Sequence, residues 1–161
     1  MSGAMILALM LAAAGTFQGD NLSLAAGRER HHPDRPGLPR CDIKAGTVAH
    51  TMKDLPRPVR DELARFSAAA RGMADAGERY NGTDVIDGDV PGSRFVRGYG
   101  LRDMWIVWYE RGGIATMMRT VALRPVSGGR GAAPAYRVES GTMLGGNMCE
   151  ATKALLAGVR S

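Results

Sequence analysis

Residues that build metal and thiol sites are scarce in this chain. It has two cysteines, Cys41 and Cys149, and three histidines. His31, His32 and Cys41 lie near one another in the sequence, but three such ligands in a polar segment fall short of the four that a structural zinc site needs. We therefore expect solvated histidines and no metal site.

Lysine is also scarce, with three lysines against eighteen arginines. The arginines are scattered and nowhere form a run of five, whereas nucleic-acid binding proteins usually concentrate positive charge on one element. This distribution argues against a nucleic-acid partner. The net charge of +5 still favours contact with anionic surfaces such as phospholipid headgroups or acidic polysaccharide.

No apolar run is long enough to cross a bilayer, which takes about twenty residues. The longest run, Met5 to Ala14, matches the apolar core of a secretory signal and ends in small residues suited to cleavage. We therefore expect residues 1–14 to be a signal peptide and the protein to be periplasmic or extracellular. Cleavage as late as Ala26, retention as a membrane tether and a packed N-terminal helix are the alternatives.

The remainder divides into a linker and one domain. Residues 15–40 are rich in glycine, proline and polar side chains, which predicts a flexible linker. Residues 41–161 have the length of a single domain and enough apolar residues to bury a core.

Two segments of this domain have the periodicity of amphipathic helices. After Leu55, apolar residues recur at spacings of four and three and form one stripe. The stripe consists of Val59, Leu63, Phe66, Ala70 and Met73. The second helix is expected to begin at Asn147, with Glu150 three residues later as in a capping box. Its apolar side would consist of Leu155, Leu156 and Val159.

Strands are predicted between the helices, over 94–99, 104–110 and 114–123, with further strands over 47–52 and 135–143. Gly112 and Gly113 are expected to form a two-residue hairpin turn, because such turns need positive φ. The predicted fold class is α+β. It is a small two-layer domain with an N-terminal helix, an antiparallel meander of three to five strands and a C-terminal helix.

The two cysteines are an even number in a chain with an export signal, which predicts a disulfide between Cys41 and Cys149. Closing a loop of about a hundred residues stabilises a fold by about 4 kcal/mol in the chain-entropy model. The alternative makes Cys149 a nucleophile, since it lies in the first turn of a predicted helix, where the helix dipole favours a thiolate. His50, the histidine of the predicted domain, would then be the base.

Other candidate motifs are incomplete. Asp84, Asp87 and Asp89 lie in a glycine-containing loop but lack the residue spacing and the distal glutamate of a calcium-binding loop. The glycine-rich stretches at 127–131 and 145–146 lack the spacing and the lysine of a phosphate-binding loop. We expect solvated turns, no cofactor and no metal.

The strand over 104–110 has large apolar side chains on both faces. Trp105, Val107 and Tyr109 share one face because side chains alternate along a strand. With a two-residue turn, Met118 and its neighbours Thr116 and Thr120 would join that face. Either helices and loops cover both faces, or one face is an exposed aromatic patch that binds a protein partner or stacks on sugar rings.

These observations predict an exported binding domain of unknown ligand rather than an enzyme. The candidate binding residues are Trp105, Tyr109, Met118, Arg97 and Arg119. The partner would be an envelope protein or a glycan, with membrane contact only through the leader. The rival hypotheses are a thiol or acid–base hydrolase centred on Cys149 and His50, and a structural component of the cell envelope.

Overall fold

The computed structural model describes residues 38–39, 41–85, 89–127 and 135–161. The predicted signal peptide (1–14) and nearly all of the predicted linker, with His31 and His32, lie outside the described residues, as does Asp87. In the described part of the chain, no helix combines the length and the apolar character needed to cross a membrane.

Helix α2 (Arg57–Ser67) follows the short 3-10 helix η1 (Met52–Asp54). Pro58 lies in the first turn, where a missing N–H removes no intrahelical hydrogen bond. Val59 and Leu63 of the predicted stripe are buried. The helix ends earlier than predicted, because a second 3-10 helix, η2 (Ala68–Ala70), follows and Arg71 adopts positive φ.

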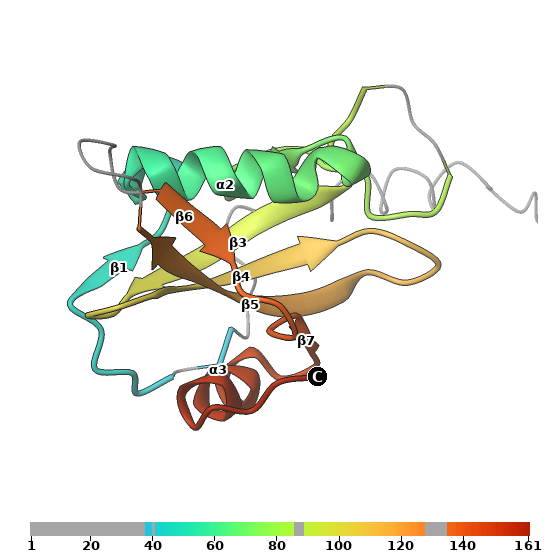
Figure 1. Ribbon diagram of the computed structural model, residues 1–161. Coiled ribbons are helices and arrows are strands. Elements are labelled where there is room, and N and C mark those ends of the chain that lie inside the picture. The colour runs from blue at the N-terminus through green and yellow to red at the C-terminus, as the bar shows by residue number, and fades with distance from the viewer. Residues whose placement is uncertain (1–37, 40, 86–88, 128–134) are drawn as a thin grey trace, which may run out of the picture.

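Seven strands of the described chain form one sheet (Figure 1). They are β1 (Thr47–Ala49), β2 (Met73–Ala74), β3 (Ser93–Gly100), β4 (Trp105–Arg111), β5 (Met117–Val126), β6 (Ala135–Val138) and β7 (Leu144–Gly145). The continuous path is β1-β3-β4-β5-β6, antiparallel throughout, and it corresponds to the predicted meander. The two-residue strands β2 and β7 pair with β3 and β5 and are too short to leave a periodic pattern.

The β4–β5 hairpin differs from the prediction. Arg111 pairs with Met117, so the connection spans residues 112–116 instead of a two-residue turn. Neither Gly112 nor Gly113 has positive φ. The prediction of a tight turn at these glycines was wrong.

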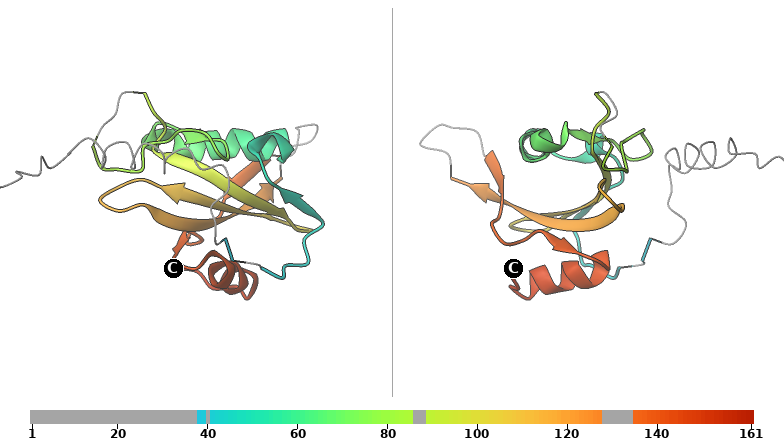
Figure 2. Two further views of the ribbon diagram at one scale, coloured as in Figure 1. Left: turned by 180° about the vertical axis from the view of Figure 1, so that it is seen from behind. Right: turned by 90° about the vertical axis from the view of Figure 1, so that its right-hand side faces the viewer.

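The sheet curves around α2, and helix α3 (Met148–Leu156) lies against its other face (Figure 2). Val59 and Leu63 of α2 pack with Val107 on one side of the sheet. Met148 and Leu155 of α3 pack with Trp108 and its neighbours on the other side. The predicted α+β class is therefore confirmed, with one helix on each face of an antiparallel sheet.

Helix α3 begins as predicted at Asn147, whose side chain accepts hydrogen bonds from the backbone N–H groups of Cys149 and Glu150. Leu155 is buried, whereas Leu156 and Val159 are exposed, so the predicted apolar side was wrong at those two residues. Cys149 forms a disulfide with Cys41, with an S–S distance of 2.03 Å. The bond attaches the start of the described domain to the N-terminus of α3.

Candidate functional site

Trp105 and Tyr109, the centre of the predicted binding face, are core residues. Trp105 is 6 % exposed and Tyr109 is fully buried, and both belong to the cluster beneath α2. Gly98 and Gly100 on β3 leave the space for this packing: a Cβ on Gly100 would lie 2.8 Å from the Trp105 ring. The prediction of an exposed aromatic patch is therefore wrong for these two residues.

The other three predicted binding residues are divided between the faces of the sheet. Arg119 pairs with Tyr109 and shares its face. Met118 pairs with Glu110, and Arg97 pairs with Trp108, which places both on the face of α3. Met118 therefore does not join Trp105 and Tyr109, contrary to the prediction.

Tyr109 lies near a concentration of positive charge. Its hydroxyl is buried and has no hydrogen-bond partner among the described residues. Burial raises the pKa of Tyr109, and the charges of Arg111 and Arg119 partly offset that effect. These arginines mark the end of the sheet where β4 leads into β5.

The thiol hydrolase hypothesis finds no thiol in this structure, because the disulfide uses Cys149 and no described cysteine is free. His50 is exposed and follows β1, where its backbone N–H donates to Asp54 Oδ2 at 2.9 Å. Helix α3, which contains Cys149, lies on the face of the sheet opposite α2 (Figure 2). Cys149 is held in the disulfide, and its contacts among the described residues do not involve His50.

Asp84 and Asp89 of the predicted acidic loop are both exposed. Across the described ranges, no group of three or more His, Cys, Asp or Glu side chains is arranged to hold a metal ion.

One hollow on the described surface is a groove of about 420 Å³ between α2 and β6. Its three arginines all have carboxylate partners inside the groove. Arg57 lies 3.7 Å from Asp61, and Arg65 and Arg137 both bind Glu62. Each arginine of this groove has a carboxylate partner, with Glu62 shared by two of them, so the groove joins the helix to the sheet.

Glu62 is the centre of that junction. Its Oε1 accepts the backbone N–H of Val138 on β6 at 2.8 Å, in addition to the arginine contacts. Burial opposes ionisation of Glu62, but the hydrogen bonds from Arg65 and Val138 outweigh it and lower its pKa. Glu62 thereby covers an edge strand that could otherwise pair with another chain.

A second hollow, of about 310 Å³, lies at the end of the sheet where η2, the loop before β3 and the β4–β5 hairpin meet. We call it the hairpin-end pocket. It is lined by Ala69, Ala70, Arg71, Asn81, Thr83, Asp84, Gly92, Arg111, Gly112 and Gly113.

Arg71 and Arg111 distinguish this pocket from the groove. Neither guanidinium has a carboxylate within ion-pair distance among the described residues. Arg71 has φ of 59°, a left-handed conformation that favours glycine or asparagine over arginine. Arg71 caps the end of η2 in this conformation, and its side chain lines the pocket.

Close backbone contacts hold the pocket walls in place. The N–H of Gly112 donates to Gly92 O at 2.9 Å, and the N–H of Gly92 donates to Ala70 O at 2.7 Å. A Cβ on Gly112 would lie 2.0 Å from Asn81 O. Glycine is therefore required at residue 112 because the backbone of the loop at Asn81 approaches closely, not because a turn needs it.

The loop at Asn81 is similarly constrained. Asn81 is buried, its Oδ1 accepts from Thr83 N and Oγ1 at 3.0 and 2.8 Å, and its Nδ2 donates to Val85 O at 2.6 Å. Thr83 also forms a bridge with Gly113, which joins this loop to the hairpin.

A buried polar cluster lies near the pocket. Arg94 Nε donates to Glu110 Oε2 at 2.7 Å, and both side chains are almost completely buried. The Tyr80 hydroxyl donates to Glu110 Oε1 at 3.3 Å, and the Arg94 guanidinium lies 4.6 Å from the Tyr80 ring centre. The cluster joins β3, β4 and the loop before β3, so it fixes the elements that carry Arg111 and Asn81.

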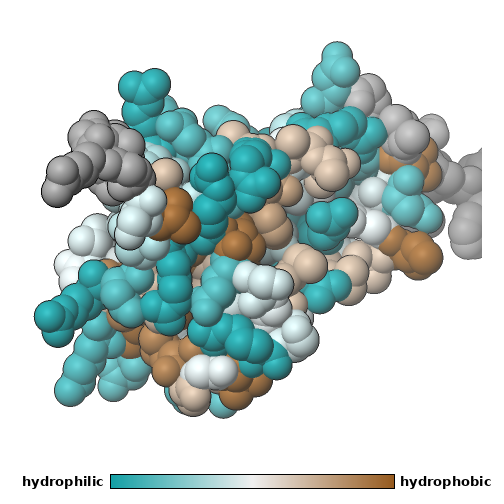
Figure 3. Space-filling model, viewed as in Figure 1, coloured by the Kyte–Doolittle hydropathy of each residue, from teal (hydrophilic) through white to brown (hydrophobic). Residues whose placement is uncertain are grey.

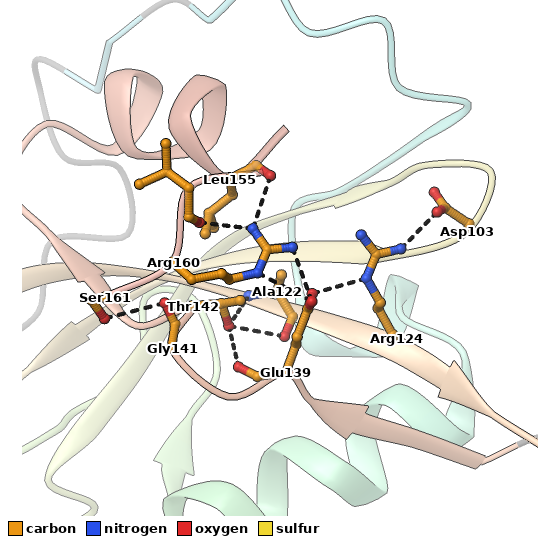
Figure 4. Close-up of polar contacts among 10 residues, drawn as sticks. Asp103, Ala122, Arg124, Glu139, Gly141, Thr142, Leu155, Arg160 and Ser161 are labelled. Carbon is orange, nitrogen blue, oxygen red and sulfur yellow. Dashed lines mark hydrogen bonds and ion pairs between the residues drawn. The ribbon is translucent and has the colours of Figure 1, made fainter. Parts of the chain in front are cut away.

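The arginines near the C-terminal residue contrast with those of the pocket (Figure 4). Glu139 binds Arg124 and Arg160 at 2.9 Å, and Arg124 also binds Asp103 at 2.7 Å. Burial opposes ionisation of Glu139, but its two arginines outweigh that effect and lower its pKa. This cluster is neutralised by its own carboxylates and anchors the last residues to the sheet.

Sequence reasoning missed Arg71 and Arg111 because neither belongs to a motif. The sequence context of these two arginines gave only an indirect indication of the site. The pair Arg71–Gly72 ends the apolar stripe of a helix, where positive φ is common. Arg111 is the last residue of a strand that is buried along most of its length, and Gly112 follows it. Only the fold brings the two arginines to one pocket.

Comparison with protein families, with curated proteins and with solved structures gave no match.

Proposed function

We propose that this protein is an exported binding domain that holds an anionic ligand in the hairpin-end pocket. The observation that carries the proposal is the pair of guanidinium groups, Arg71 and Arg111, without carboxylate partners in a hollow with constrained walls. This site replaces the aromatic face as the binding surface.

Export is supported by the disulfide and by the leader-like segment at residues 5–14. Structural disulfides persist in oxidising compartments and are rare in the cytosol. Cys41 and Cys149 are 108 residues apart in the sequence, and their Cα atoms are 5.4 Å apart in the fold. This pairing supports maturation in a compartment where thiols are oxidised.

The chemistry of the pocket favours a carboxylate or a phosphate group. Guanidinium groups bind both anions through paired, charge-assisted hydrogen bonds. Asp84 is the one carboxylate among the described residues of the lining, so with the two arginines these residues carry a net charge of +1. This balance favours a ligand with a single anionic group at the point of contact.

Titration of the oxidised protein with sodium phosphate, followed by ¹H–¹⁵N NMR, tests this proposal. Sodium chloride at matched ionic strength serves as the reference. We expect saturable shifts of the side-chain Nε–Hε signals of Arg71 and Arg111 and of the backbone signal of Gly113.

The variant Arg71→Gln should abolish the saturable shifts. Arg102→Gln is the matched control, since Arg102 is exposed and lies in the β3–β4 turn at the other end of the sheet. Shifts that are absent, or that persist equally in both variants, would exclude an anion site in the pocket and favour a purely structural envelope component.

A further inference from the structure

Aliphatic side chains project into solvent beside the hairpin-end pocket. Ile114 at the hairpin tip is 96 % exposed and Val85 is 69 % exposed, and Met117 at the start of β5 is also exposed. The bridge between Thr83 and Gly113 holds the two loops side by side. Single exposed apolar residues are common, but a group of them on adjoining loops marks an interaction surface.

The space-filling view agrees with this grouping. Hydrophobic side chains reach the surface at the right-hand end of the molecule, where the β4–β5 hairpin and the loop before β3 lie (Figures 1 and 3). We call Val85, Ile114 and Met117 the apolar tip.

Positive charge lies directly behind the apolar tip. Arg111 ends β4, and Ile114 lies three positions further along the chain, a reach of at most about 10 Å. Arg71, the residue that follows η2, lines the same pocket. Asp84 and Asp89, two exposed carboxylates among the described residues of the neighbouring loop, form no ion pair with these arginines.

We infer that this end of the molecule docks on an anionic phospholipid bilayer, with a headgroup phosphate in the pocket and the apolar tip among the acyl chains. This inference rests on the proposed anion site and names its ligand. A bilayer presents phosphates above an apolar layer, and peripheral proteins bury apolar side chains about 5–10 Å into that boundary. A glycan supplies anions but no apolar layer for Ile114, so the apolar tip favours lipid.

The inference extends membrane contact beyond the leader, to which the sequence-based prediction confined it. The docking energy would combine two independent contributions. Burial of Ile114 strengthens binding about thirtyfold, and each arginine near an anionic surface contributes about fivefold.

Sedimentation of the oxidised mature chain with vesicles tests the inference. One set of vesicles contains phosphatidylglycerol mixed with phosphatidylcholine, and the other contains phosphatidylcholine alone. We expect binding to the anionic vesicles only, lowered about thirtyfold by Ile114→Ser and about fivefold by Arg111→Gln. Val48→Ser and Arg102→Gln, at exposed residues away from the hairpin, should bind like the parent protein.

Because Ile114 is almost fully exposed, Ile114→Ser leaves the core intact, and phosphate should still shift the pocket signals in that variant. Saturable phosphate binding without vesicle binding, or vesicle binding that Ile114→Ser leaves unchanged, would overturn the lipid inference and leave the anion site standing. Arginine-dependent capture by an immobilised acidic polysaccharide, without vesicle binding, would likewise overturn it. Loss of phosphate binding in the parent protein would instead refute the proposed function.

Discussion

Replacement of Glu110 by glutamine tests whether the buried ion pair holds the hairpin end of the sheet in place. The Arg94 side chain is 4 % exposed and that of Glu110 is 1 % exposed, so water cannot take the place of the lost charge. Glutamine has nearly the same shape but removes the negative charge that binds the buried Arg94 guanidinium. Breaking a buried pair in this way costs about 3–5 kcal/mol.

The measurement is urea unfolding of the oxidised protein, with the free energy and the slope fitted together. Glu150→Gln is the matched control, because Glu150 binds Lys153 at 2.9 Å on the surface. An exposed pair of this kind contributes no more than about 0.5 kcal/mol. The contrast between the two variants isolates the effect of burial.

The double variant Arg94→Met with Glu110→Leu completes the test. Replacing both partners by apolar side chains leaves neither charge of the pair in the core, so most of the stability lost in Glu110→Gln should return. If Glu110→Gln costs no more than Glu150→Gln, the pair does not stabilise this region and the reasoning fails.

Three further predictions follow from the packing. Trp105→Ala should lower the free energy of unfolding by about 3–5 kcal/mol in urea, because Trp105 fills the core beneath α2; a loss below about 1 kcal/mol would contradict a core role. Gly112→Ala should lower the free energy of unfolding by about 1–3 kcal/mol, because its Cβ would overlap Asn81 O. Gly113→Ala should change the free energy of unfolding by less than about 0.5 kcal/mol, because the nearest atom to its Cβ is 3.7 Å away. Equal losses of stability in the two variants would refute the close contact at Gly112. The folded pKa of Glu62 lies below its unfolded value, so its contribution is present above the unfolded pKa and is lost as the pH falls through the folded pKa. Glu62→Gln should therefore flatten the acid side of the stability curve between about pH 5 and pH 3, and an unchanged slope there would count against the assignment.

The sequence predicted the fold class because its main signals are local. The helical stripe through Val59 and Leu63 and the cap at Asn147 depend on neighbouring residues, and the structure contains both. The disulfide followed from the number of cysteines and the leader-like segment, and Cys41 and Cys149 do meet.

Cross-strand register could not be obtained in the same way. A two-residue turn at Gly112 and Gly113 would pair Tyr109 with Thr116, whereas the loop over 112–116 pairs it with Arg119. The difference is three residues, an odd number, so every side chain of β5 changes face. The prediction that Met118 lies beside Trp105 failed for this reason.

The function of Gly112 was misread because glycine has two uses. It can supply positive φ, or it can admit another segment of backbone, and only the second applies here. The approaching segment contains Asn81, about thirty residues earlier in the sequence. No local pattern reports such a contact, and the pocket formed by Arg71 and Arg111 arises from the same long-range packing.

The disulfide and the proposed binding surface both depend on one claim. The claim is that the chain matures outside the cytosol, in a compartment where thiols are oxidised. Intact-mass measurement of the protein isolated from its producing cells, after treatment with an alkylating reagent under non-reducing denaturing conditions, tests it most directly. We expect a mass without residues 1–14 and no alkyl group on Cys41 or Cys149. A full-length chain that accepts two alkyl groups would contradict export and oxidation together.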